Sequence, residues 1–130
     1  MLDIIGIGSL NLDYTLTTEK LNALSDVVVK KLMAKVERGA EKFAAEAAIK
    51  EIIALLGNDY FRVTLGGSAF NTCSAMAALS AGLKVGCIGV AGDHKNGVPD
   101  VIDAMNTLGI DHKYVNLREG KDSGLCLSLN

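Results

Sequence analysis

Two polar residues, Asn11 and Asp13, follow an apolar segment that has the composition of a short buried strand. In extended backbone, residues two apart point to the same side, so the amide and the carboxylate would face one pocket. A carboxylate accepts hydrogen bonds from neighbouring hydroxyl groups, and an amide both donates and accepts, which suits a polyol ligand. The two residues are also typical of a turn that ends a strand, and the pair alone favours that simpler interpretation.

A second candidate site begins at Gly66 and Gly67, where a segment of alternating strand-like residues gives way to a helical pattern. Glycines at such a junction let backbone N–H groups approach a ligand with no Cβ in the way, at the partially positive end of a helix. Asn71 comes four residues after Gly67 and would project from the first helical turn on the same side. The alternative is a tight turn that only starts a helix, with Asn71 capping it or facing solvent.

The glycines of the opening segment, Gly6 and Gly8, resemble the start of the fingerprint of nicotinamide dinucleotide-binding proteins. Asn11 stands where that fingerprint has its third glycine, and the residues after it are turn-forming and β-branched rather than helical. The fingerprint also needs an acidic residue about 20 positions on, and Asp26 has that spacing but lies where a helix is predicted to start. An NAD-binding Rossmann protein is therefore kept as an alternative only.

The elements that must position these residues alternate between strand-like and helix-like patterns, which predicts a doubly wound α/β sheet with a small β appendage. The first strand is expected to be buried on both faces, because it is an apolar run broken only by glycines. The predicted strands are residues 4–8, 60–65 and 84–90, with a further extended segment at 14–18 and a hairpin formed by 114–117 and 125–129. The predicted helices are residues 25–35, 40–56, 69–81 and 96–108.

Composition and charge exclude several classes of partner. The formal net charge of −2 gives no general attraction to nucleic acid or to anionic membranes. No apolar run approaches the roughly 18 residues of a membrane span, and the N-terminus lacks the basic region of a signal peptide, so we expect a cytoplasmic protein. Three cysteines and two histidines have no metal-ligand spacing, so we predict free thiols and no metal site; these residues are Cys73, Cys87, Cys126, His94 and His112.

Four motifs occur along the chain in a fixed order. They are Asn11-x-Asp13, the segment from Gly66 to Thr72 that opens an alanine-rich helix, the segment from Gly86 to Asp93 followed by Gly97, and Leu108-Gly109-Ile110-Asp111. Together they resemble the N-terminal part of the ribokinase-like (PfkB-type) carbohydrate kinases, and the resemblance runs from Met1 to Asn130. The stretch between Asp13 and Gly66 is more similar to the adenosine-kinase-like and related sugar-kinase branches than to ribokinase itself.

The resemblance implies a ribokinase-like fold and a substrate site. It implies that Asn11 and Asp13 bind hydroxyl groups of a sugar or nucleoside, that Gly66 and Gly67 frame the substrate, and that Asn71 makes a further contact. It also implies a small β lid with elements near residues 14–18 and 112–130, to which Ser123 and Gly124 would belong. A homodimer formed through this lid is a further expectation.

In the family, a C-terminal part binds ATP with Mg²⁺ and carries a Gly-Ala-Gly-Asp motif whose aspartate deprotonates the acceptor hydroxyl. Residues 1–130 match only the N-terminal, substrate-binding part, so we expect an incomplete domain with no catalytic residue and no kinase activity of its own. Ala91-Gly92-Asp93 resembles the motif but follows an early strand, so Asp93 is expected to be a loop or cap residue rather than the base. The alternative from another class is a non-catalytic ligand-binding or interaction module.

Overall fold

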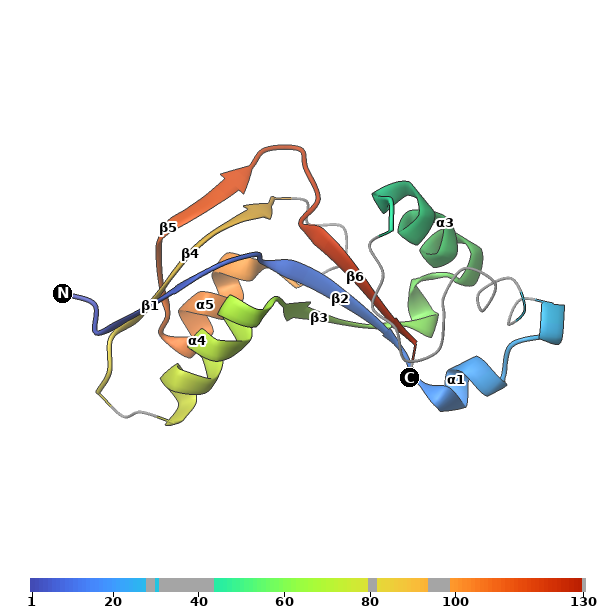
Figure 1. Ribbon diagram of the computed structural model, residues 1–130, viewed down its shortest axis with the longest axis horizontal. Helices are drawn as coiled ribbons and strands as arrows, with labels where there is room; N and C mark the ends of the chain where they lie inside the picture. Colours follow the sequence, from blue (N-terminus) through green and yellow to red (C-terminus); the bar gives the residue numbers. More distant parts are fainter. Residues whose placement is uncertain (28–29, 31–43, 80–81, 94–98, 130) are drawn as a thin grey trace. The chain divides into compact units, whose positions relative to one another are not determined.

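The computed structural model describes residues 1–27, 30, 44–79, 82–93 and 99–129 (Figure 1). The chain divides into two compact units. The first unit comprises Met1–Asp13 and Val63–Leu125, and the second comprises Tyr14–Arg62 and Cys126–Asn130.

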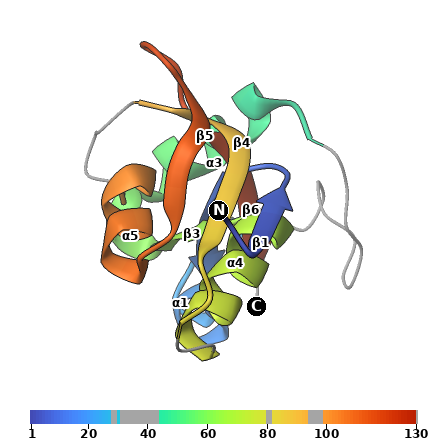
Figure 2. The same ribbon diagram turned by 90° about the vertical axis from the view of Figure 1, so that its left-hand side faces the viewer.

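A three-stranded parallel sheet forms the centre of the first unit. Its strands are β1 (Ile4–Ile7), β4 (Val85–Gly92) and β5 (Asp111–Arg118), in the order β1-β4-β5. Figure 2 shows β4 between the other two strands. Parallel strands need crossover connections, and the helices α4 (Ser68–Leu79) and α5 (Val101–Leu108) occur in the segments between them. The predicted α/β class is therefore confirmed.

Both helices pack on one face of this sheet and enclose the main hydrophobic core. Cys73 of α4 and Met105 of α5 are fully buried there, against Val85 and Cys87 of β4. The alanine-rich composition of α4 lets it approach β1 closely, since an ideal Cβ on Gly8 would lie 2.9 Å from the Cβ of Ala69. This close packing explains the glycines of the opening segment without a dinucleotide, so the fold gives the Rossmann alternative no support.

The opposite face of the sheet is largely uncovered, and the prediction that the first strand is buried on both faces is wrong. The side chain of Ile7 is 74% exposed and that of Ile5 is 47% exposed. The reason is that α4 and α5 both join the core on the side of Val85 and Cys87, and successive side chains of a strand point to opposite faces. An apolar pattern shows that a strand can be buried on both faces, but the fold decides whether it is.

The helix α5 begins later than predicted. Asp100 is its N-cap, and the Asp100 carboxylate accepts hydrogen bonds from the backbone N–H groups of Ile102 (2.8 Å) and Asp103 (3.1 Å). Pro99 therefore precedes the cap instead of lying in the first turn. The helix ends at Gly109, whose left-handed backbone (φ 69°) is the conformation that favours glycine.

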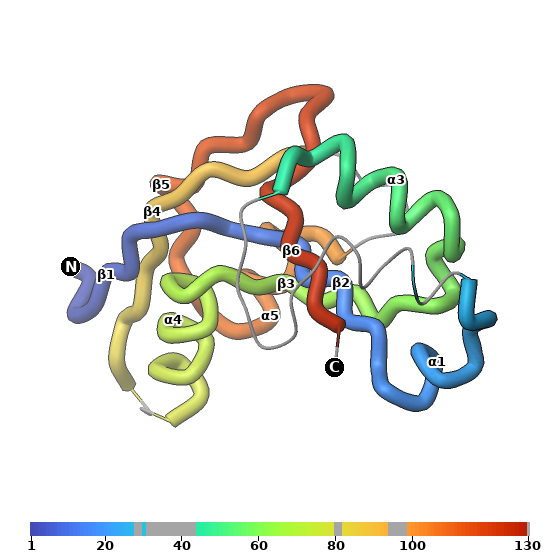
Figure 3. Tube along the Cα trace, turned by 45° about the vertical axis from the view of Figure 1, so that its right-hand side comes forward, coloured from blue at the N-terminus to red at the C-terminus, as the bar shows by residue number. Residues whose placement is uncertain are grey.

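A second sheet has the strand order β3-β2-β6. Its strands are β3 (Arg62–Gly66), β2 (Asn11–Leu16) and β6 (Gly124–Leu129), and the boundary between the two units passes through all three. The chain runs from β1 directly into β2 (Figure 3). The predicted hairpin is wrong, because β5 pairs with β4 in the parallel sheet whereas β6 belongs to this second sheet.

The second unit contains short helices around the ends of these strands. They are α1 (Thr18–Asn22), α3 (Glu46–Leu56) and the 3-10 turn η1 (Asn58–Tyr60). The extended segment predicted at 14–18 ends at Leu16, because Thr17 caps α1. Tyr14 and Phe61 pack edge to face with ring centroids 5.8 Å apart, and Leu16 is fully buried.

Parts of the two predicted helices of this unit, at 25–35 and 40–56, lie outside the described residues. Within the described residues, the second of these helices begins at Glu46, whose carboxylate forms an ion pair of 2.7 Å with Lys50. No helix in the described part of the chain is long and apolar enough to cross a membrane.

Candidate functional site

The strand β2 places Asn11 and Asp13 on the same side. Burial alternates along the strand: Leu12 and Tyr14 are buried, whereas Asn11 and Asp13 are half-buried. This is the arrangement that their spacing predicts for extended backbone. Both residues therefore belong to a strand, and the alternative that they form a turn is wrong.

The carboxylate of Asp13 lies directly against Gly66, the last residue of β3. An ideal Cβ built on Gly66 would overlap the carboxylate, so no larger residue at position 66 leaves Asp13 where it is. Burial raises the pKa of the Asp13 carboxyl above its usual value, because a partly desolvated carboxylate is less stable in its charged form. A hydrogen-bond acceptor is therefore held within β2 in a partly desolvated environment.

Gly67 has two structural reasons to be glycine. Its backbone is left-handed, with φ 98°, which strains any residue with a side chain. An ideal Cβ at this position would also overlap the backbone carbonyl oxygen of Ser9, in the loop that follows β1. The diglycine is thus a tight junction between β3 and α4, packed against the end of β1.

Asn71 lies in the first turn of α4, and its side chain is exposed. Its backbone N–H donates to the carbonyl oxygen of Gly67 at 2.9 Å, which starts the helical hydrogen bonding. The structure therefore places Asn11 and Asp13 on β2 beside the end of β3, where Gly66 and Gly67 lie, with Asn71 one helical turn beyond.

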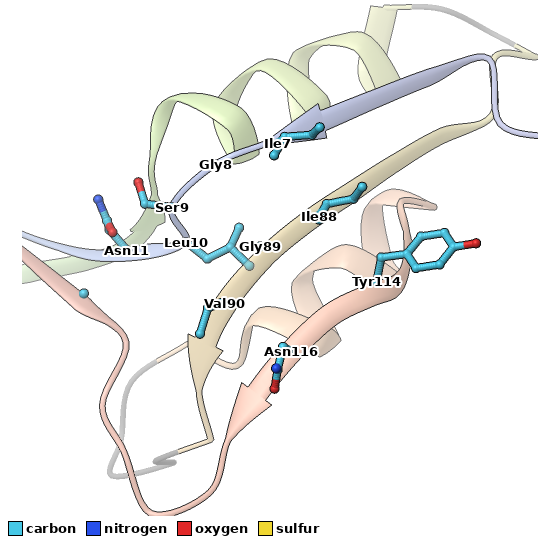
Figure 4. A pocket seen from close by; sticks show the side chains of 11 residues that line it. Ile7, Gly8, Ser9, Leu10, Asn11, Ile88, Gly89, Val90, Tyr114 and Asn116 are labelled. Atoms are coloured by element: carbon cyan, nitrogen blue, oxygen red, sulfur yellow. The ribbon is translucent and has the colours of Figure 1, made fainter.

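A hollow of about 570 Å³ lies beside Asn11, on the uncovered face of the parallel sheet (Figure 4). Ile7, Ile88 and Tyr114 are paired across the three strands and line it together. Asn11 is the predicted site residue that also lines this hollow, together with Asn116 and Gly124. Sequence reasoning missed Tyr114 and Asn116, although their separation by two residues on a strand was a usable signal.

Asp93 and His112 make local hydrogen bonds, and Cys87 is a buried thiol. The Asp93 carboxylate accepts a hydrogen bond from the backbone N–H of Gly120 at 2.8 Å, which fits a loop residue. His112 Nε2 lies 3.0 Å from the Asn106 side-chain oxygen, whereas His94 is outside the described residues. Burial and the neighbouring Cys73 raise the pKa of the Cys87 thiol to about 11, so Cys87 is a poor nucleophile. Cys73, Cys87 and Cys126 form no disulfide.

No group of three or more histidines, cysteines, aspartates or glutamates lies together within the described ranges. The chain also lacks the sequence of a phosphate-binding P-loop.

No protein-family model and no curated protein sequence matches this chain. Solved structures do match its fold. The adenosine kinase from Sinorhizobium meliloti matches with a TM-score of 0.69 and 16% identity, over 99% of this chain and 36% of that one. The adenosine kinase from Schistosoma mansoni in complex with 2-fluoroadenosine matches with a TM-score of 0.68 and 14% identity, over 98% and 35%. A PfkB protein from Polaromonas sp. JS666 matches with a TM-score of 0.58 and 20% identity, over 100% and 32%.

This chain has part of the ribokinase-family fold. It spans about a third of the length of the kinases that it matches, and almost all of its residues take part in the match. Identities of 14 to 20% show the ribokinase-family fold and nothing finer. The resemblance inferred from the four sequence motifs is thus confirmed at the level of the fold.

Proposed function

We propose that this chain is the substrate-binding part of an ATP-dependent kinase that phosphorylates a hydroxyl group of a sugar or nucleoside. The observation that supports this most is the Asp13 carboxylate, which lies against Gly66 and shares one side of β2 with Asn11. A carboxylate and an amide on one side of a strand can bind neighbouring hydroxyl groups of a polyol.

The residues of this chain would act by binding and orientation. Asp13 accepts hydrogen bonds from two hydroxyl groups, Asn11 donates and accepts at the next position, and Gly66 and Gly67 let the ligand approach the backbone. Fixing the sugar in this way aligns the reacting hydroxyl for in-line attack, which is the main contribution a protein makes to phosphoryl transfer. ATP and Mg²⁺ supply the phosphoryl group and neutralise its charge, and the residues that bind them would lie in the remainder of the fold.

Binding by the unmodified chain tests the proposal. We expect titration calorimetry of residues 1–130 to show binding of adenosine or D-ribose, and Asp13→Ala to weaken it about 10- to 100-fold, as expected when a charged hydrogen-bond acceptor is removed. Asp26→Asn is the matched control, because it removes an exposed carboxylate distant in sequence from the site. No binding of either ligand, or equal binding by Asp13→Ala, would contradict the proposal.

Turnover is a separate expectation. Because this chain spans only about a third of the length of the kinases that it matches, we expect no phosphorylation of either ligand by residues 1–130 with Mg²⁺ and ATP. Measurable turnover by the purified chain would show that it carries a complete active site.

A further inference from the structure

The side chain of Asn11 lies against a second glycine, Gly124, at the start of β6. An ideal Cβ on Gly124 would lie 2.7 Å from the Asn11 side-chain oxygen and 3.5 Å from its Cγ. The first of these distances is shorter than real Cβ contacts, so a side chain at position 124 must displace the Asn11 amide. Gly124 and Asn11 also line the same hollow beside the parallel sheet.

Gly124 cannot easily move away, because the residues before it are fastened to the end of β4. The Gly92 N–H donates to Ser123 Oγ at 2.9 Å, and the Gly120 N–H donates to Asp93 Oδ1 at 2.8 Å. An ideal Cβ on Gly92 would overlap the backbone of residues 121–123, so the two segments pack with their main chains in contact. The turn between β5 and β6 is therefore fastened to the end of β4 at Gly120 and at Ser123, the residue immediately before Gly124.

The position of the Asn11 amide thus depends on a residue of another strand. Backbone at Gly124 is fixed by the Ser123 and Asp93 hydrogen bonds, whereas the Asn11 carboxamide is the free end of a flexible side chain. A methyl group at position 124 would therefore move the amide rather than the strand. Gly124→Ala should therefore change the free energy of unfolding little. It should still move the Asn11 amide far enough to weaken its hydrogen bonds to a ligand.

We propose that Gly124 is a positioning residue of the substrate site: its bare Cα sets the place of the Asn11 amide, and the Gly92–Ser123 and Asp93–Gly120 hydrogen bonds hold Gly124 there. This inference rests on the proposed function, because the consequence of a displaced amide is weaker binding of a hydroxyl-bearing ligand. It adds to the site a residue of another strand that lies against the Asn11 side chain.

A double-mutant cycle tests the inference on the full 130-residue chain, with adenosine and D-ribose as the probes in titration calorimetry. We expect Gly124→Ala to weaken binding about tenfold, and to have no further effect in the Asn11→Ala background, where no amide remains to be displaced. The double variant also removes the overlap, so it stays folded if the single variant does not. Equal weakening in both backgrounds, or no weakening by Gly124→Ala, would overturn the inference.

Gly86→Ala is the matched control. It places the same methyl group on β4, where the nearest atom is the flexible end of Leu2, 2.5 Å away, and no site residue is displaced. We expect it to bind both probes like the unmodified chain.

A spectroscopic measurement separates positioning from a general structural effect. The side-chain NH₂ signals of Asn11 in a ¹H–¹⁵N spectrum, assigned by their loss in Asn11→Ala, should shift in Gly124→Ala and stay in place in Gly86→Ala. Unmoved Asn11 signals in Gly124→Ala would refute the inference. If the unmodified chain binds neither probe, the proposed function fails, whereas binding without coupling between positions 11 and 124 means that only the Gly124 inference fails.

Discussion

At the scale of single residues, Asp13 combines a cost in stability with the binding role that we propose for it. Burial raises the pKa of its carboxyl, so the folded state holds the proton more tightly than the unfolded state does. The unfolded chain therefore binds fewer protons between the two pKa values, and this group makes the free energy of unfolding fall as the pH rises through that window. At neutral pH the partly buried, ionised carboxylate is therefore less stable in the folded state than its protonated form would be.

Asp13→Asn is therefore expected to raise the melting temperature at pH 7 by roughly 2 to 4 °C while it weakens ligand binding. The gain should shrink as the pH falls toward the pKa of the carboxyl, where the aspartic acid is itself neutral. Thermal melts at several pH values measure this, with Asp26→Asn as the control for loss of a surface charge. A variant that is less stable at pH 7 would show that the Asp13 carboxylate is stabilising, contrary to its burial.

The glycines around this site show what residue type alone could indicate. Gly66 and Gly67 were identified from their place between a strand-like and a helix-like segment, and Gly67 does have a left-handed backbone. That Gly66 makes room for Asp13, and Gly124 for Asn11, could not be predicted, because each pair lies on two strands that are distant in sequence.

At the scale of elements, α5 shows how capping sets a boundary. The helical pattern alone predicts a start near residue 96, whereas the hydrogen bonds of the Asp100 carboxylate begin the helix at Val101. A side-chain acceptor satisfies backbone N–H groups that no preceding turn can bond, and this local chemistry outweighs the pattern of apolar residues.

Asp100→Ala is expected to lower the free energy of unfolding by about 1 kcal/mol, because it leaves those N–H groups without their acceptor. Urea denaturation followed by circular dichroism measures the change. Asp103→Ala is the control from the same helical turn, since it removes a carboxylate near the helix N-terminus but no N-cap, and its effect should be smaller. Equal effects would mean that charge rather than capping stabilises this helix end.

The strands β5 and β6 show the limit of local patterns. The turn-forming residues between them are typical of a hairpin, and both flanking segments are indeed strands. The two strands nevertheless belong to different sheets, because β5 pairs in parallel with β4 whereas β6 lies beside β2. Pairing depends on which strands the rest of the fold brings together, which the turn alone cannot specify.

At the scale of the whole molecule, the uncovered face of the parallel sheet is the most unusual feature. Parallel sheets normally have both faces covered, yet Ile7, Val90 and Tyr114 are each at least half exposed. These side chains lie opposite the face that packs on α4 and α5. An apolar face of this kind is expected to bind hydrophobic dyes and to limit solubility.

Ile7→Lys is therefore expected to reduce fluorescence of the dye 8-anilinonaphthalene sulfonate while changing the free energy of unfolding by no more than about 0.5 kcal/mol. Met105→Ala, on the covered face, should instead cost about 2 to 5 kcal/mol, because that side chain is fully buried. Dye titration and urea denaturation measure the two quantities. A large loss of stability in Ile7→Lys would mean that this face is covered in solution.

The sequence by itself determined the α/β class, the helix α4 after the diglycine, and the shared side of Asn11 and Asp13. These features follow from periodicity and from the backbone preferences of glycine, which act over a few neighbouring residues. Only the tertiary structure decided that Asp13 lies on Gly66, that Gly124 lies on Asn11, and that one sheet face is uncovered. Each of these depends on strand order and on where the helices pack, which are set by contacts between residues far apart in the chain.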